Sequence, residues 1–158
     1  MCVIIDANML SRVFNKENKE HKKYIMLYDW LVKKEGVMVV VGTKYLKELK
    51  KCKSIYIKVM NNLQLKIVSI NKDKVDKIYD KLIKENRITQ KKNDYHLVAL
   101  ATESNCKLIV TYDSNAKKYL LHNKKLYPPY FDLPKIYCPK LHLELCNKRY
   151  FTKECKQV

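Results

Sequence analysis

The stretch NDYHLVALATESNCKLIVTYDSN, residues 93–115, contains three consecutive structural signals. Residues 93–105 predict a helix with apolar side chains on one face. Residues 107–111 (KLIVT) form a short apolar run that is typical of a buried strand. Residues 114–122, which begin inside the stretch and continue beyond it, predict a second helix. A helix, a strand and a helix in immediate succession indicate an α/β fold.

The rest of the chain repeats this alternation of short apolar runs and longer helical segments. We expect Gly36 to end one helix and Thr43 to cap another. The expected strands are residues 3–5, 37–41, 66–70 and, at an edge, 135–138, and the expected helices are residues 21–35, 45–60 and 72–84. This alternation predicts a three-layer α/β/α sandwich with a central, mostly parallel sheet.

All four prolines of the chain lie in the stretch YPPYFDLPKIYCPK, residues 127–140. Because proline lacks a backbone N–H, this stretch cannot form a regular helix. We therefore divide the chain into a main domain, residues 1–125, and a C-terminal extension, residues 126–158, that packs on the same domain. A chain of 158 residues is long enough to bury one ordinary core.

The chain carries 33 Lys and Arg against 16 Asp and Glu, which gives a formal net charge of +17. This excess favours a polyanionic partner, because binding nucleic acid releases its condensed counterions. A lysine-rich composition that simply follows an A/T-rich genome is the alternative. No apolar run approaches the ~18 residues needed to cross a bilayer. No secretory signal is visible, so we expect a cytoplasmic protein without a membrane partner.

The six cysteines are not arranged as a disulfide framework, and we expect Cys2, Cys52 and Cys106, which lie in apolar patterns, to be free cysteines that pack as small hydrophobic residues. Near the C-terminus, Cys138, His142, Cys146 and Cys155 have the side-chain chemistry of a zinc site. The paired C-x₂₋₄-C spacing of many such sites is missing, so zinc is the less favoured interpretation of this segment.

Four acidic residues lie where the chain passes between predicted strands and helices. Asp6 ends the first strand, and Asp113 follows the strand KLIVT. Glu48 and Asp94 lie in the first two turns of their helices, on the same side as the apolar residues. Because sites in α/β sheets form at the carboxyl ends of the strands, we expect the four carboxylates to converge.

Each acid also has an ordinary structural explanation. Asp6, Asp94 and Asp113 can stabilise helix N-termini, and Glu48 can pair with lysines one helical turn away. Separately, these roles do not explain why four acids converge in a chain of charge +17. Clustered carboxylates repel one another unless a cation lies between them, and oxygen ligands suit Mg²⁺ or Mn²⁺. Metal ions held in this way can hydrolyse a phosphodiester.

The sequence resembles the PIN-domain ribonucleases, in particular their small single-domain, toxin-type members. The resemblance covers about residues 2–121 and rests on VIIDANML, TKYLKELKK and the stretch 93–115. It implies a parallel sheet and a Mg²⁺- or Mn²⁺-dependent endoribonuclease that cleaves single-stranded RNA. The implied catalytic and metal-binding residues are Asp6, Glu48, Asp94 and Asp113, and the implied supporting polar residues are Asn8, Thr111, and Ser114 or Asn115. Tyr112 departs from the family pattern, in which an acidic or small polar residue is common.

Lysines near these positions are expected to hold the RNA backbone, namely Lys44, Lys47, Lys51, Lys91, Lys92, Lys117 and Lys118. The alternative to an enzyme is a PIN-like module that binds nucleic acid without catalysis. A phosphatase of the haloacid dehalogenase type would need D-x-D after the first strand, where Asp6 is followed by Ala7 and Asn8. A toxin–antitoxin role, a homodimer and an antitoxin-like partner are further hypotheses that the resemblance leaves open.

Overall fold

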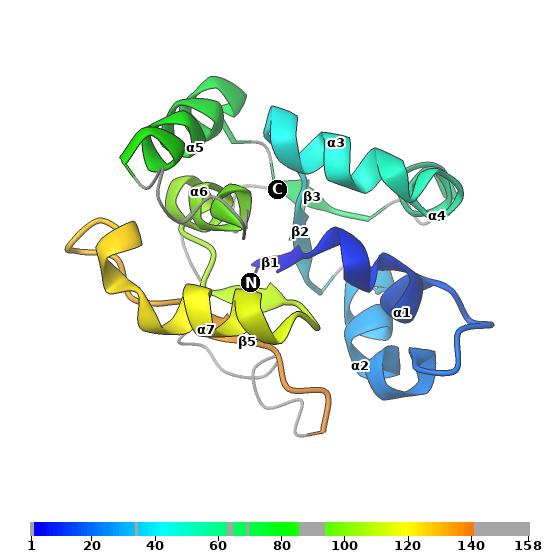
Figure 1. The fold of residues 1–158 in the computed structure, drawn as a ribbon. Coiled ribbons are helices and arrows are strands. Elements are labelled where there is room, and N and C mark those ends of the chain that lie inside the picture. Colours follow the sequence, from blue (N-terminus) through cyan, green and yellow to red (C-terminus); the bar gives the residue numbers. More distant parts are fainter. Residues whose placement is uncertain (1, 34, 63–64, 69, 86–93, 141–158) are drawn as a thin grey trace.

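The structure, a computed structural model, describes residues 2–33, 35–62, 65–68, 70–85 and 94–140. Its centre is a five-stranded sheet in the order β3-β2-β1-β4-β5, in which every neighbouring pair is parallel (Figure 1). The strands are β1 (Cys2–Ile5), β2 (Val37–Val39), β3 (Ile67–Val68), β4 (Leu108–Val110) and β5 (Lys135–Ile136). The predicted α/β class with a mostly parallel sheet is therefore confirmed.

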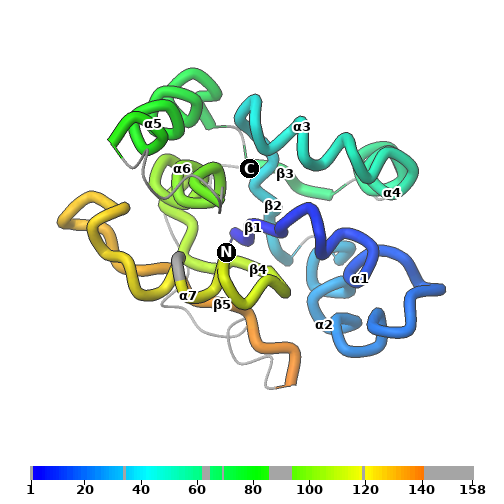
Figure 2. The backbone as a smooth tube through the Cα atoms, viewed as in Figure 1, coloured from blue at the N-terminus to red at the C-terminus, as the bar shows by residue number. Residues whose placement is uncertain are grey.

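Helices cover both faces of this sheet. The helices are α1 (Leu10–Phe14), α2 (His21–Val32), α3 (Thr43–Lys51), α4 (Lys53–Ile57), α5 (Lys72–Glu85), α6 (Tyr95–Ser104) and α7 (Ser114–His122), with short turns η1 (Ala7–Met9), η2 (Lys58–Asn62) and η4 (Lys124–Leu126). Helices α1, α2, α3 and α4 lie on one side of the sheet, while α5, α6 and α7 lie on the other (Figure 2). This is the three-layer sandwich that the alternation of strands and helices predicted.

Strand β1 lies in the middle of the sheet, and this central position explains its composition. Each of its four residues, Cys2–Ile5, is fully buried, since helices cover both faces of the sheet around it. A parallel strand buried on both faces reads as a continuous apolar run rather than as alternating apolar and polar residues. The polar residue that follows, Asp6, therefore leaves the sheet at its carboxyl edge.

Helix α2 ends at Val32, three residues before the predicted end of the helix at residue 35. The backbone amides of Glu35 and Gly36 both donate to the carbonyl oxygen of Trp30, at 3.1 and 3.3 Å, so the chain turns back early. A Cβ atom at Gly36 would lie 2.1 Å from the indole ring of Trp30. Glycine is thus required at this turn because the ring packs against its backbone.

The prediction that Thr43 caps the following helix is wrong. Gly42 occupies the N-cap position of α3 with a φ of +91°, a conformation that favours glycine. Asp76 of α5 takes over the capping role from a distant part of the chain. Its Oδ1 accepts from the backbone amide of Thr43 at 2.7 Å, and its Oδ2 accepts from the Thr43 hydroxyl at 2.7 Å. Helix α5 therefore holds the start of α3 in place.

The prediction of a single helix over residues 45–60 is also wrong. Helix α3 ends at Lys51, and Cys52, with φ of −95° and ψ of 45°, separates it from α4. The π-helical turn η2 then follows α4 directly. The Cys52 thiol donates to the carbonyl oxygen of Ala7 at 3.6 Å, so the break lies against the turn that follows β1.

The described part of the C-terminal extension joins the main sheet. Strand β5 pairs with β4 at the sheet edge, which confirms the predicted edge strand, although its regular pairing covers fewer residues than expected. The apolar side chains of Leu126, Tyr127, Phe131 and Tyr137 are buried in the core. The boundary proposed at residue 125 stays a prediction.

The cysteines differ from the expectation in one respect. Cys52, Cys106 and Cys138 are free, but Cys2 is disulfide-bonded, so the expectation that Cys2 is a free cysteine is wrong. Of the residues considered for zinc, His142, Cys146 and Cys155 lie outside the described residues. In the described part of the chain, no helix is both long and apolar enough to cross a bilayer.

Candidate active site

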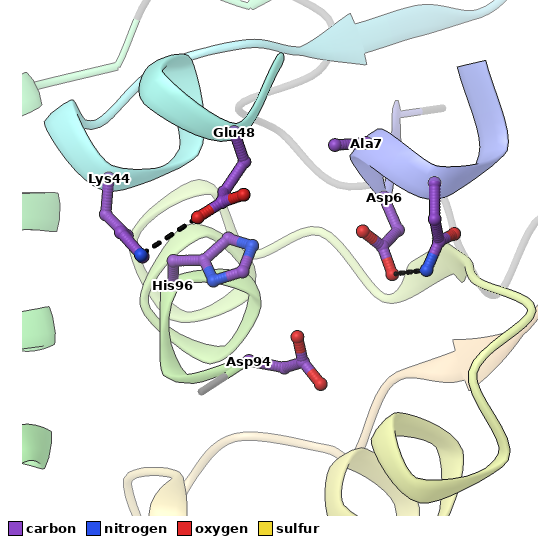
Figure 3. A pocket seen from close by; sticks show the side chains of 7 residues that line it. Asp6, Ala7, Lys44, Glu48, Asp94 and His96 are labelled. Atoms are coloured by element: carbon purple, nitrogen blue, oxygen red, sulfur yellow. Dashed lines mark hydrogen bonds and ion pairs between the residues drawn. The ribbon is translucent and has the colours of Figure 1, made fainter. Parts of the chain in front are cut away.

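A cavity of about 340 Å³ lies at the carboxyl edge of the sheet (Figure 3). We call it the acid pocket, because three of the four predicted acids line it. Its lining residues are Asp6, Ala7, Asn8, Lys44, Glu48, Asp94 and His96. They come from the end of β1, from α3 and from the start of α6, three segments far apart in the sequence.

Asp6 is held rigidly at the end of β1. Its backbone amide donates to the carbonyl oxygen of Val110 at 2.9 Å, which extends the pairing of β1 with β4 by one residue. Its Oδ2 accepts from Asn8 Nδ2 and from Thr111 Oγ1, each at 2.8 Å. The side chain makes no capping hydrogen bond to the turn that follows. Helix capping therefore does not explain this carboxylate, which is only 7% exposed.

Asp94 occupies the N-cap position of α6, but its carboxylate makes no capping hydrogen bond either. Its side chain points into the acid pocket that Asp6 also faces (Figure 3). Burial and the negative charges of Asp6, Asp113 and Glu48 raise the pKa of Asp94 to about 6. Asp6, Glu48 and Asp113 are thus each close enough to repel Asp94, as expected for carboxylates near one site.

Glu48 adopts the ordinary role that the sequence also allowed. Its Oε1 lies 2.9 Å from Lys44 Nζ, and its Oε2 lies 2.7 Å from Lys51 Nζ. Hydrogen bonds from Lys51 and Lys44 hold the pKa of Glu48 below its usual range. The carboxylate nevertheless lines the acid pocket, so the two lysines compensate its charge at the pocket wall.

Asp113 lies outside the lining of the acid pocket and caps α7. Its Oδ1 accepts from the backbone amides of Asn115 at 2.7 Å and Ala116 at 3.3 Å. Its own amide donates to Thr111 Oγ1 at 3.2 Å, so Thr111 links this residue to Asp6. Ser114 and Asn115 are exposed at the start of the same helix.

Two aromatic residues that sequence reasoning did not assign to the site support it. The buried ring of His96 lines the acid pocket and stacks on Tyr45, with ring centroids 5.9 Å apart. The Tyr45 hydroxyl donates to the carbonyl oxygen of Ile5, next to Asp6. Burial, followed by the charge of Asp6, raises the pKa of Tyr45. The helical spacing of Tyr45 with the apolar residues of α3 predicted that its side chain is buried. It did not predict the hydrogen bond to Ile5.

The predicted RNA-binding lysines are distributed around the acids. Lys44 lines the acid pocket and also a neighbouring cavity of about 320 Å³, which Lys47 lines as well. Lys117 and Lys118 lie on α7 beside Asp113. Lys91 and Lys92 fall outside the described residues.

The acid pocket fits a hard divalent cation by its chemistry. Within the described residues, no three His, Cys, Asp or Glu side chains form a group that could hold a metal ion as they stand. Asp6 and Asp94, however, make no ion pair with any Lys or Arg in the described part of the chain. Carboxylate oxygens are the ligands that Mg²⁺ and Mn²⁺ prefer. A cavity of about 340 Å³ also has room for an ion with several waters.

Comparison with known proteins identifies one family. A family model described as the PIN domain matches residues 3–119. The matched residues include all four acids and all strands except β5. No curated protein matches the chain significantly. Members of this family are typically nucleases that use divalent metal ions and act on RNA.

Proposed function

The chain belongs to the PIN-domain family, and from this premise we propose that it is a metal-dependent endoribonuclease. It hydrolyses phosphodiester bonds of single-stranded RNA with Mg²⁺ or Mn²⁺ held by Asp6, Glu48, Asp94 and Asp113. The observation that carries the proposal is the convergence of Asp6, Glu48 and Asp94 on one pocket, with Asp113 near enough to raise the pKa of Asp94.

In this mechanism the protein supplies fixed oxygen ligands. Asn8 and Thr111 both donate to one oxygen of Asp6, which leaves its Oδ1 for a cation. Asp94 faces the same pocket and adds a second carboxylate without a Lys or Arg partner among the described residues. The chemistry that a divalent ion supplies at such a site is activation of water and stabilisation of charge on the phosphodiester.

Glu48 and its two lysines have a linked role in this proposal. Glu48 already lines the acid pocket and would contribute a carboxylate to a bound cation. Lys44 and Lys51, which pair with it here, would then be available to neutralise substrate phosphates. Each anion would keep a cationic partner at the pocket wall.

The alternative is a PIN-like module that binds nucleic acid without cleaving it. The pairing of Glu48 with two lysines favours this alternative, because it removes one acid from the metal site. The carboxylates of Asp6 and Asp94 oppose it. A protein that only binds a polyanion gains nothing from two acids that lack cationic partners in the described residues.

The test is cleavage of end-labelled single-stranded RNA by the purified protein. We expect cleavage with Mn²⁺ or Mg²⁺, no cleavage with EDTA, and loss of cleavage in Asp6→Asn and Asp94→Asn. Asp73→Asn, at an exposed acid of α5 that lines neither the acid pocket nor the neighbouring cavity of Lys44 and Lys47, is the matched control and keeps the activity. Circular dichroism verifies that each variant is folded. If both site variants cleave as fast as the wild type, the site assignment is wrong.

Two outcomes separate the candidate functions. Binding of RNA without cleavage in any divalent metal supports the non-catalytic module. Cleavage that requires metal and Asp6 supports the enzyme. The toxin-type role, cytoplasmic localisation, homodimer and antitoxin-like partner stay predictions from the sequence.

A further inference from the structure

Tyr112 is an exposed aromatic residue beside the acid pocket. It lies between Thr111, whose hydroxyl donates to Asp6, and Asp113, which caps α7. Although large aromatic side chains favour burial, 59% of this residue is exposed.

Two cationic side chains accompany this ring. The guanidinium carbon of Arg12 lies 3.7 Å from the ring centroid of Tyr112, and Lys117 Nζ lies 5.9 Å from it. Arg12 belongs to α1 and Lys117 to α7, so the two helices bring their charges to the loop after β4 (Figure 2). Within the described residues, Arg12 forms no ion pair with a carboxylate. Its Nη1 is buried without a hydrogen-bond partner in the described residues, so an anion can meet the charge only through the rest of this half-buried side chain.

The contact with Arg12 leaves part of the Tyr112 ring exposed for a second stacking partner. A guanidinium stacked at 3.7 Å covers one face of a planar ring, and the large exposed fraction of Tyr112 means that the rest is open to solvent. Stacking on Arg12 also holds the ring of Tyr112 in one orientation. The ring therefore loses less conformational entropy when a second partner stacks on it. An oriented ring with positive charge beside it has the two features that bind unpaired nucleotides, a stacking surface and a phosphate partner.

We propose that Tyr112, with Arg12 and Lys117, forms a stacking platform for one unpaired base of the RNA next to the cleavage site. This inference rests on the proposed function, because it assumes an RNA substrate in the acid pocket. The base stacks on the open part of the ring, and Arg12 and Lys117 neutralise the adjacent phosphate. The platform favours single-stranded RNA, since a paired base cannot leave its helix to stack on the ring without cost.

Binding of a fluorescein-labelled single-stranded RNA, measured by anisotropy in EDTA, tests the platform without cleavage. We expect Tyr112→Ala to weaken binding about 5- to 150-fold, the range that loss of one stacked base implies. Tyr112→Phe keeps the ring and should bind as the wild type does. The matched control is Tyr130→Ala, which removes another exposed tyrosine. Tyr130 lines a different cavity together with Thr102 and Glu103, whereas Asp94 lies at the opposite end of α6.

A substrate with one abasic nucleotide distinguishes stacking from a structural role of Tyr112. Moving the abasic site along the RNA should weaken wild-type binding at one position in particular, and this dependence should vanish in Tyr112→Ala. Equal binding by wild type and Tyr112→Ala overturns the inference. The inference is also overturned if the wild type shows no dependence on the abasic position, or if Tyr112→Ala keeps the same dependence, because the ring then only links α1 to the loop after β4.

Cleavage in Mn²⁺ separates this inference from the proposed function. If the wild type cleaves RNA and Tyr112→Ala binds it equally well, the platform is wrong and the endoribonuclease stands. If the wild type neither binds nor cleaves single-stranded RNA, both proposals fail. Weaker binding by Tyr112→Ala alongside metal-dependent cleavage by the wild type supports both.

Discussion

Removing the charge of Asp94 should stabilise the metal-free protein. The pKa of this carboxyl rises from its ordinary value of 3.8 to about 6 through burial and the charges of Asp6, Asp113 and Glu48. At 1.36 kcal/mol for each pH unit, this rise corresponds to about 3 kcal/mol of destabilisation when the group is ionised. Because Asp94 is only half-buried, solvent screening reduces the expected effect to about 1–2 kcal/mol.

The sign of the effect depends on pH. Well below its ordinary pKa of 3.8, at about pH 3, the carboxyl is largely protonated in both the folded and the unfolded chain, so it has little effect on stability. As the pH rises through about 4 to 6, the unfolded chain releases the proton while the folded chain keeps it, and the stability of the wild type falls. Asp94→Asn does not titrate. The variant should therefore be more stable than the wild type near neutral pH, and this difference should disappear near pH 3.

Urea denaturation in EDTA, followed by circular dichroism at several pH values, measures this difference. Asn and Asp are equally good N-cap residues, so the substitution leaves the start of α6 unchanged. The control Asp80→Asn, at an exposed acid of α5, should stay within about 0.5 kcal/mol of the wild type at every pH. Mg²⁺ or Mn²⁺ should reverse the order, since a ligand at about 100 times its Kd adds about 2.7 kcal/mol to the wild type alone. An Asp94→Asn variant that is no more stable than the wild type near neutral pH would refute the repulsion.

Three further substitutions test the supports of the site. Thr111→Val removes a hydroxyl that donates to Asp6 and accepts from the amide of Asp113, and should lower metal affinity or the cleavage rate about 10- to 100-fold. Unchanged metal affinity and cleavage would show that Asp6 needs no such support. Asp76→Ala removes the cap of α3 and should lower the free energy of unfolding by about 1 kcal/mol in urea. An unchanged free energy would mean that α3 needs no cap from α5. Gly42→Ala should lower the melting temperature, because its φ of +91° strains any residue with a Cβ atom. A melting temperature equal to that of the wild type would contradict this reason.

The elements that the sequence predicted well are those specified by neighbouring residues. The helix predicted over residues 114–122 matches α7 at both ends. Its start is specified locally, since Asp113 caps the two amides that follow. The division of the helix expected over residues 45–60 was not predictable in this way. The start of α3 depends on Asp76, which lies 33 positions away from Thr43.

The candidate site shows the same difference between features specified by neighbouring residues and features that depend on distant contacts. The four acids were found because each lies just after a predicted strand or in the first two turns of a predicted helix, and their role at a metal site stays a prediction. The hydrogen bond from Thr111 to Asp6 joins residues 105 positions apart and exists because β1 and β4 are neighbours in the sheet. The pairing of Arg12 with Tyr112 depends on α1, a short helix that the sequence did not predict. Contacts between elements that are far apart in the sequence are therefore the part of the site that could not be predicted from the sequence.

The four acids do not have equal value as tests of catalysis. Asp113 caps α7 and Glu48 pairs with two lysines, so each has a structural role that its replacement also removes. Loss of the Asp113 cap alone is expected to destabilise the fold by about 1 kcal/mol, and any loss of activity would then have two explanations. Asp6 and Asp94 cap nothing, and within the described residues they pair with no lysine or arginine. The charge of Asp94 opposes the stability of the metal-free fold, and a cation bound between Asp94 and Asp6 would relieve this repulsion. A variant that loses cleavage while gaining stability therefore identifies a metal ligand more clearly than one that loses both.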